Sequence, residues 1–235
     1  MNVFIDLETI PDQSEGAIEK IAESIAVSVP SDLTKPKLMD AIGTDDKYKT
    51  VPELKEIWLD MFGQDQKMIQ AKEKWLKTSF DGGYGEIICI GFELNHGTEC
   101  LYGDEKRILQ SFWDHIGDEL NGRSPFFIAH NAKFDLPFLW KRSVINNVPV
   151  PSGFNPHGRH GVSHYCTSEG WAGYGNRISL NNLAKILGCE SKTEGMSGDQ
   201  VWPEFQKGNI EKISKYCEQD VNVLRQVYNK MNFIN

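Results

Sequence analysis

A run of β-forming residues near the start of the chain decides the fold: Val3-Phe4-Ile5-Asp6-Leu7-Glu8-Thr9, followed by a turn at Pro11. Branched and aromatic residues that stop at a proline are typical of a buried strand. Alternate residues of a strand share a face, so Phe4, Asp6 and Glu8 lie on the same side. A buried carboxylate is costly unless a partner or a metal ion compensates it. The pair Asp6 and Glu8 is therefore a candidate cation site, with a solvated acidic edge as the alternative.

The composition is that of a globular protein. The 235 residues are 40% hydrophobic and 25% charged, with a formal net charge of −8. This charge excludes a protein that coats nucleic acid by bulk attraction, but it agrees with an active site built from carboxylates. No apolar run approaches the roughly 18 residues of a membrane span, and the start does not resemble a secretory signal. The five cysteines form no C-x-x-C pair, so we expect reduced thiols and a cytoplasmic location.

The rest of the chain predicts an α/β fold with a mixed sheet flanked by helices. A helical insert is expected at about 12–83, with helices near 15–29 and 53–77 separated by a polar segment at 31–50. Two strands then form a hairpin that turns at Asn95-His96-Gly97, and the first strand is expected to join them. The pattern continues with an amphipathic helix that ends before Asn121-Gly122, a strand at 125–129 and a helix that Pro137 starts. It ends with a short helix between Ser179 and Gly188 and a helix at 210–231. We treat 1–235 as one domain that includes the insert.

Two further acidic sites follow the first strand. Asn131-x-x-Phe134-Asp135 lies where a strand meets a helix, and helix capping by Asp135 is the alternative explanation. Tyr216 and Asp220 are one helical turn apart within an apolar stripe, where a core hydrogen bond is the alternative to a functional site.

Taken together, these three motifs resemble a known family. Asp-x-Glu, Asn-x-x-Phe-Asp and Tyr-x-x-x-Asp, in this order, are similar to the exonuclease motifs of the DEDD superfamily of 3′→5′ exonucleases, in the subgroup with Tyr in the third motif. The segments 4–11, 183–188 and 216–221 resemble stand-alone exonucleases related to the proofreading domain of family B DNA polymerases. The resemblance spans nearly the whole chain and is weakest in the insert. It implies a ribonuclease H-like fold.

The resemblance also implies roles for individual residues. Asp6, Glu8, Asp135 and Asp220 would bind two divalent ions, Mg²⁺ or Mn²⁺, and Tyr216 would position the attacking water. Thr9, Ile10, Asn131 and Phe134 would contact the substrate. Hard oxygen ligands and the two-metal chemistry of phosphodiester cleavage agree with this assignment. Relatives often carry an Asp about where this chain has Cys166.

The leading functional hypothesis is a metal-dependent exonuclease that releases nucleoside monophosphates from the 3′ end of DNA, expected to be single-stranded. A polymerase or repair partner would be a separate chain, because 235 residues leave no room for a polymerase domain. The alternatives are a 3′→5′ exoribonuclease on the same fold and a catalytically silent nucleic-acid-binding subunit.

Three other features have a less specific interpretation. The histidines His157, His160 and His164, together with Cys166, have a spacing that suggests zinc, but a polar loop that ends in a strand explains them better. Arg159 is a candidate for a contact with the DNA backbone. Lys192 could approach the scissile phosphate, but a solvated loop lysine is the favoured explanation. In the insert, lysines around Trp75 suggest single-strand binding, whereas an amphipathic helix that packs through Met68, Trp75 and Leu76 is the favoured explanation.

Overall fold

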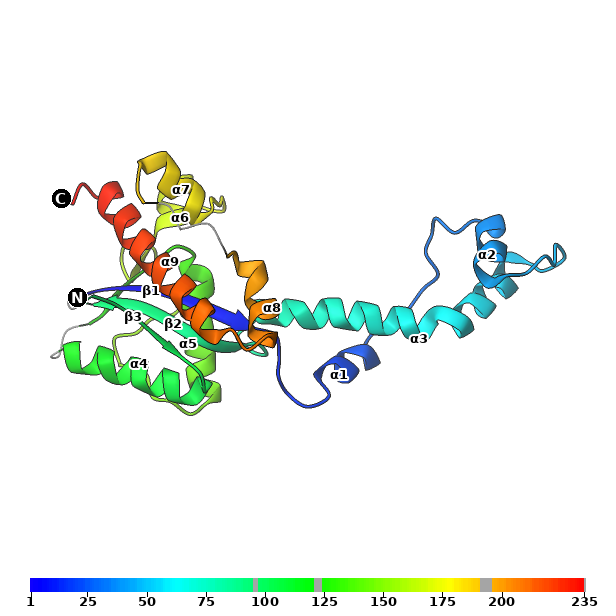
Figure 1. The fold of residues 1–235 in the computed structure, drawn as a ribbon, viewed down its shortest axis with the longest axis horizontal. Coiled ribbons are helices and arrows are strands. Elements are labelled where there is room, and N and C mark those ends of the chain that lie inside the picture. The colour runs from blue at the N-terminus through cyan, green and yellow to red at the C-terminus, as the bar shows by residue number, and fades with distance from the viewer. Residues whose placement is uncertain (95–96, 121–123, 191–195, 235) are drawn as a thin grey trace. The chain divides into compact units, whose positions relative to one another are not determined.

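The computed structural model describes residues 1–94, 97–120, 124–190 and 196–234 (Figure 1). They form two compact units, one of Met1–Pro11 with Ser79–Asn235 and one of Asp12–Thr78. The strands are β1 (Asn2–Ile10), β2 (Glu86–Leu94), β3 (Gly97–Tyr102), β4 (Phe126–Ala129) and β5 (His164–Cys166). The helices are α1 (Ala17–Glu23), α2 (Lys35–Ile42), α3 (Val51–Lys77), α4 (Glu105–Leu120), α5 (Ala132–Ile145), α6 (Thr167–Ala172), α7 (Leu180–Leu187), α8 (Val201–Gln206) and α9 (Ile210–Met231), with 3₁₀ turns at Thr78–Phe80 and Gly198–Gln200.

The larger unit is built on a mixed sheet, as the sequence predicts. Within the described residues its strand order is β3-β2-β1-β4-β5. Strand β1 is central: it pairs antiparallel with β2, where Asp6 lies opposite Gly91, and parallel with β4, where Phe4 lies opposite Ile128. The predicted pairing of the first strand with the hairpin is confirmed.

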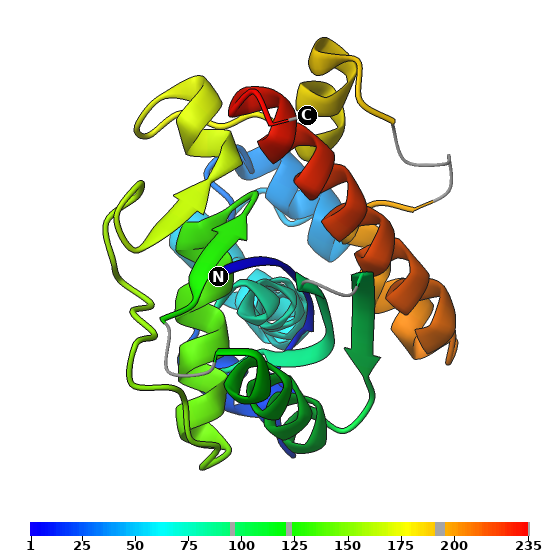
Figure 2. The ribbon, with the colours of Figure 1, turned by 90° about the vertical axis from the view of Figure 1, so that its left-hand side faces the viewer.

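The sheet is covered on both faces. Ile5 and Leu7 belong to a large apolar cluster with residues of α4 and α5, such as Phe112 and Leu136. On the opposite face, Phe4 packs with Leu224 of α9, whereas Ile10 packs with α8 and with the start of α9. Figure 2 shows α9 on one side of the sheet and α4 with α5 on the other. The alternation along β1 therefore directs Asp6 and Glu8 toward α9.

The smaller unit, Asp12–Thr78, is helical. Helix α3 begins with a capping box, in which Thr50 and Glu53 satisfy each other's backbone N–H groups, and it packs against α1 and α2 through small apolar clusters. Trp75 is 9% exposed and donates its indole N–H to the Asp12 carbonyl at 2.7 Å. Because its ring is covered, Trp75 does not offer a stacking face to a nucleic acid. Met68 is partly buried, but Leu76 is exposed, contrary to the packing expected for it.

Several sequence expectations about the helices are wrong. The first helix ends at Glu23, and α2 lies inside the segment expected to be a loop, where Thr34, Pro36 and Gly43 supply its ends. The short helices α6 and α8 were not predicted. Pro137 lies inside α5 instead of starting it, because packing of the helix in the core offsets the backbone hydrogen bond that a proline removes.

Other expectations are confirmed or lie beyond the described residues. Ser179 caps α7 through the backbone N–H of Asn182, and Gly188 ends this helix in the left-handed conformation with φ 67°. The predicted turns at Asn95-His96 and Asn121-Gly122 lie outside the described residues, as does Lys192. None of the described helices combines the length and the apolar character that a membrane span requires.

A buried ion pair joins α4 to α5 beneath the sheet. Glu105 accepts from Arg142 Nε at 2.8 Å and Nη2 at 2.7 Å, and both side chains are about one tenth exposed. The same carboxylate accepts from the Asn146 amide at 2.8 Å and from the Ile87 backbone N–H at 2.7 Å. Glu105 therefore connects α4, α5 and β2 through one charged group.

We expect Glu105→Gln to lower the free energy of unfolding by about 3–5 kcal/mol, because the Arg142 guanidinium would then be a buried charge without its counter-ion. The double variant Glu105→Gln with Arg142→Met should recover most of this loss. Asp81→Asn is the matched control, because the Asp81 to Lys141 pair is exposed on both sides and should contribute less than about 1 kcal/mol. Urea titration of each variant measures the effect. Equal losses for Glu105→Gln and the control would contradict the structural role of the pair.

Candidate active site

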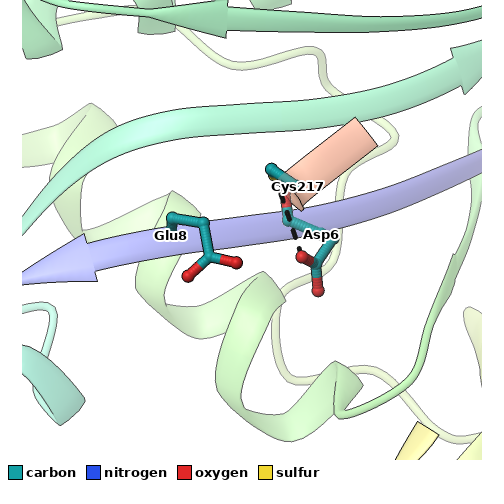
Figure 3. A group of neighbouring side chains, drawn as sticks. All are labelled: Asp6, Glu8 and Cys217. Carbon is teal, nitrogen blue, oxygen red and sulfur yellow. Dashed lines mark hydrogen bonds between the residues drawn. The ribbon is translucent and has the colours of Figure 1, made fainter. Parts of the chain in front are cut away.

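Strand β1 presents two carboxylates from the same face. Glu8 is buried, and Asp6 is half-buried. One ligand atom each from Asp6, Glu8 and Cys217 lie within 4.8 Å of one another, and Figure 3 shows both carboxylates on the same side of the strand. The predicted pairing of Asp6 with Glu8 on one face is therefore present in the structure. The alternative of a fully solvated edge does not fit the burial of Glu8.

Gly91 allows α9 to approach this face of the sheet closely. A Cβ atom at Gly91 would lie 2.7 Å from Cys217 Sγ, 3.0 Å from Val221 Cγ2 and 3.2 Å from the Cys217 carbonyl oxygen. Because Gly91 is directly opposite Asp6 in the sheet, this close approach lies beside the carboxylates. Cys217 Sγ then donates to the Asp6 backbone oxygen at 3.5 Å and to its carboxylate at 3.8 Å.

Helix α9 brings Tyr216 and Asp220 to the same place. Asp220 is 6% exposed, and Tyr216 is half-buried one turn before it. Burial raises the pKa of Tyr216 well above its ordinary value, and the negative charges of Asp220, Glu8 and Asp6 raise it further. The Tyr216 hydroxyl also donates a hydrogen bond to Asp220. The structure therefore places Tyr216 among three carboxylates and keeps its hydroxyl protonated.

Asp135 approaches from α5. The parallel pairing of β1 with β4 places the carboxyl end of β4, and with it the start of α5, beside the half of β1 that carries Asp6 and Glu8. Asp135 is 4% exposed, and burial raises its pKa to about 8. The capping alternative is wrong, because Asn131 occupies the N-cap position of α5 and Asp135 lies within the helix.

The comparison with known families agrees with this arrangement. A family model described as a predicted 3′–5′ exonuclease related to the exonuclease domain of PolB matches residues 97–235, more than half of the chain. The chain belongs to this family. The match includes Asp135, Tyr216 and Asp220, and it begins after β1 and the helical unit. No curated protein matches the chain. The mixed sheet with flanking helices is consistent with a ribonuclease H-like exonuclease fold.

The residues expected to contact the exonuclease substrate lie in different environments. Thr9 donates its hydroxyl to the Ser79 carbonyl at 2.7 Å. Ile10 is 1% exposed within an apolar cluster, so its side chain is not accessible to a substrate. Asn131 makes no side-chain capping bond and lines a small pocket. Phe134 is partly buried against Phe138 and Phe80, with ring centroids 5.3 and 6.5 Å away.

The histidine segment does not gather into a metal cluster. Among the described residues, the candidate metal-ligating group is Asp6, Glu8 and Cys217. His160 Nδ1 accepts from the Cys166 backbone N–H at 3.0 Å, and His157 packs against the Trp140 ring. These contacts agree with the polar loop that ends in strand β5, which was the favoured explanation.

The carboxylates fit a divalent metal, which exonuclease domains of this kind usually use. Glu8, Asp135 and Asp220 are each less than 9% exposed, and hard cations favour such oxygen ligands. Cys217 fits this role less well, because burial raises the pKa of its thiol well above the ordinary value, and a neutral thiol is a poor ligand for a hard cation. Cys217 therefore serves as a hydrogen-bond donor to Asp6.

Gly91 and Cys217 are the site residues that the sequence analysis missed. An isolated glycine inside an apolar strand pattern, as at Gly91 between Ile90 and Phe92, is a known signal for close approach of another backbone. Cys217 lies within the third motif, but its neighbours in sequence do not reveal that it contacts Asp6.

We expect Gly91→Ala to destabilise the protein by about 1–3 kcal/mol and to lower nuclease activity, because the added methyl group would push α9 away from Asp6. Adding Cys217→Ala to Gly91→Ala should restore part of the stability and part of the activity. It removes the sulfur that would lie 2.7 Å from the new Cβ atom but leaves the Cys217 carbonyl oxygen at 3.2 Å from it. Cys217→Ala alone is the control. Thermal unfolding and initial cleavage rates of the three variants measure the effect. A Gly91→Ala variant as stable and active as the wild type would refute the close-approach argument.

Proposed function

We propose that this chain is a metal-dependent 3′→5′ exodeoxyribonuclease that removes nucleoside monophosphates from a single-stranded 3′ end. The observation that carries the proposal is the grouping of Asp6 and Glu8 of β1 with Asp220 of α9 near Tyr216, whose pKa their charges raise. The buried Asp135 at the start of α5 supports it. Membership of an exonuclease family supports the same conclusion. Each element is part of the core, so the reacting groups are held rigidly.

In the proposed mechanism, Asp6, Glu8, Asp135 and Asp220 would hold two divalent ions, Mg²⁺ or Mn²⁺. When bound, such a pair supplies an acidified water and stabilises the charge on the departing 3′ oxygen. The carboxylates would contribute by holding the ions in fixed positions, and these ions would bind the scissile phosphate. Thr9, Asn131 and Phe134 remain the proposed contacts for the terminal nucleotides, together with the backbone at Ile10.

Tyr216 has a separate task in this mechanism. Its raised pKa keeps the phenol protonated at neutral pH, so it cannot remove a proton from water. Its hydroxyl can accept one hydrogen bond while it donates another to Asp220. Tyr216 would therefore orient the attacking water, a contribution that depends on position and not on basicity.

We expect Asp6→Asn, Glu8→Gln, Asp135→Asn and Asp220→Asn each to abolish most cleavage without unfolding the protein. Each change removes a metal ligand but also relieves repulsion between carboxylates, so the metal-free stability should be equal or higher. Asp114→Asn, an exposed acid on α4, is the matched control. The assay uses 5′-labelled DNA and RNA oligonucleotides, single- and double-stranded, with Mg²⁺ or Mn²⁺. Near-normal activity of Asp135→Asn would exclude the proposed metal site, and faster cleavage of RNA would indicate an exoribonuclease.

We expect Tyr216→Phe to lower kcat by roughly 10- to 1000-fold while metal affinity stays close to that of the wild type, because the phenyl ring keeps its packing and only the orienting hydroxyl is lost. Asp220→Asn should cost more and should also weaken metal binding. Calorimetry with Mn²⁺ and single-turnover rates separate the two effects. Tyr228→Phe, on the same helix and packed through its ring against Phe4, is the control. Equal losses of metal binding in Tyr216→Phe and Asp220→Asn would make Tyr216 a structural partner of Asp220.

A further inference from the structure

A small polar pocket lies beside the proposed active site, and the mechanism above does not use it. It has a volume of about 120 Å³ and is formed by the start of α5, the end of β5 with α6, and the loop that follows α6. The residues around it are Asn131, Lys133, Cys166, Ser168, Glu169, Gly175, Asn176 and Arg177. This volume corresponds to about four water molecules at ~30 Å³ each, which is enough space for a phosphate group.

The pocket lies next to the turn of α5 that carries Asp135. Asn131 lines it and accepts the backbone N–H of Asp135 at 3.2 Å through its carbonyl oxygen. Cys166 lines it as well, and its thiol lies close enough to Asp135 for that carboxylate to add to the pKa increase that burial causes. A strand whose last phosphodiester lies at Asp135 would therefore extend toward this pocket.

The pocket carries cationic side chains, and the exposed aromatic ring of Tyr174 contacts one of them, Lys133. Lys133 Nζ lies 3.0 Å from the Glu169 carboxylate and 4.1 Å from the centroid of the Tyr174 ring. Tyr174 is 84% exposed. Because Glu169 neutralises Lys133, the exposed Arg177 gives the pocket a net positive charge.

This combination matches the chemistry of single-stranded nucleic acid. Base stacking on an aromatic ring and ion pairs between cations and phosphates are the contacts that sequence-independent single-strand binding uses. Lys133 restrains the Tyr174 ring through the cation–π contact, which lowers the entropy lost when a base stacks on it. The whole chain has a net charge of −8, so the positive charge of this pocket is opposite in sign to that of the protein as a whole.

We propose that this pocket and the neighbouring Tyr174 bind the single-stranded DNA that precedes the last two nucleotides, on the 5′ side of the scissile phosphate, with a base on Tyr174 and a phosphate at Arg177. This inference rests on the proposed function, because it takes the 3′ end to lie at the carboxylates. Its consequence is that longer strands are held more tightly than short ones. The pocket contributes to binding and not to the chemical step.

The test compares a dinucleotide with a DNA dodecamer. For Tyr174→Ala we expect the Kd of the dodecamer, measured by fluorescence anisotropy with chelator present, to rise about 5- to 150-fold. For Arg177→Gln we expect the salt dependence of dodecamer binding to become shallower by about 0.7 in log–log slope. Cleavage of the dinucleotide should be unchanged in both variants, and Tyr174→Phe should bind as the wild type does because it keeps a stacking ring.

Phe233→Ala and Arg107→Gln are the matched controls, since both residues are exposed and lie in other elements. The inference about the pocket would be overturned if Tyr174→Ala and Arg177→Gln bound the dodecamer with the same Kd as the control variants. It would also be overturned if the two variants lost cleavage of the dinucleotide and of the dodecamer to the same extent. A wild-type protein that binds the dodecamer but cleaves neither substrate would instead overturn the proposed function, and a loss of binding in Tyr174→Ala would then still support the pocket. Equal weakening of a duplex and a single strand would contradict the stacking role of Tyr174.

Discussion

The close approach of α9 to the sheet at Gly91 is the contact on which the candidate site depends. Without a side chain at Gly91, Cys217 and Val221 pack directly on the strand beside β1. Asp6 and Glu8 then lie between two apolar regions of the same interface, one around Phe4 and one around Ile10. The apolar contacts on either side stabilise an arrangement in which neighbouring carboxylates would otherwise repel one another.

Helix α9 therefore has two roles: its apolar stripe packs in the core, and its polar residues contribute to the candidate site. Leu224 and Val227 bury α9 against the sheet and its neighbouring helices, whereas Tyr216 and Asp220 face the carboxylates of β1. On the opposite face of the sheet, an ion pair between Glu105 and Arg142 joins α4 to α5. Burial also raises the pKa of Asp135 to about 8. The desolvation that accompanies packing of the core therefore also affects the protonation of a proposed metal ligand.

The limits of sequence reasoning are clearest where local signals compete with packing. Pro137 suggested the start of a helix, but α5 begins at Ala132 because its apolar residues are buried against the sheet and compensate for the proline. Helix α2 was missed because its polar composition resembled a loop, although Thr34, Pro36 and Gly43 were available as signals for its ends. Trp75 and its lysines suggested a stacking surface, and only the folded unit shows the indole covered.

The sequence alone predicts the mixed α/β fold, the pairing of the first strand with the hairpin, and the chain order of Asp6, Glu8, Asp135, Tyr216 and Asp220. These follow from periodicity and short motifs, which depend on neighbours in the chain. The folded structure is needed to show that Gly91 lies opposite Asp6, that Cys217 donates to this carboxylate, and that Asn131, Lys133 and Arg177 line one pocket. These contacts join residues that are far apart in sequence. The distances between them depend on the register of the strands and on how closely the helix packs on the sheet, and no local sequence pattern encodes either.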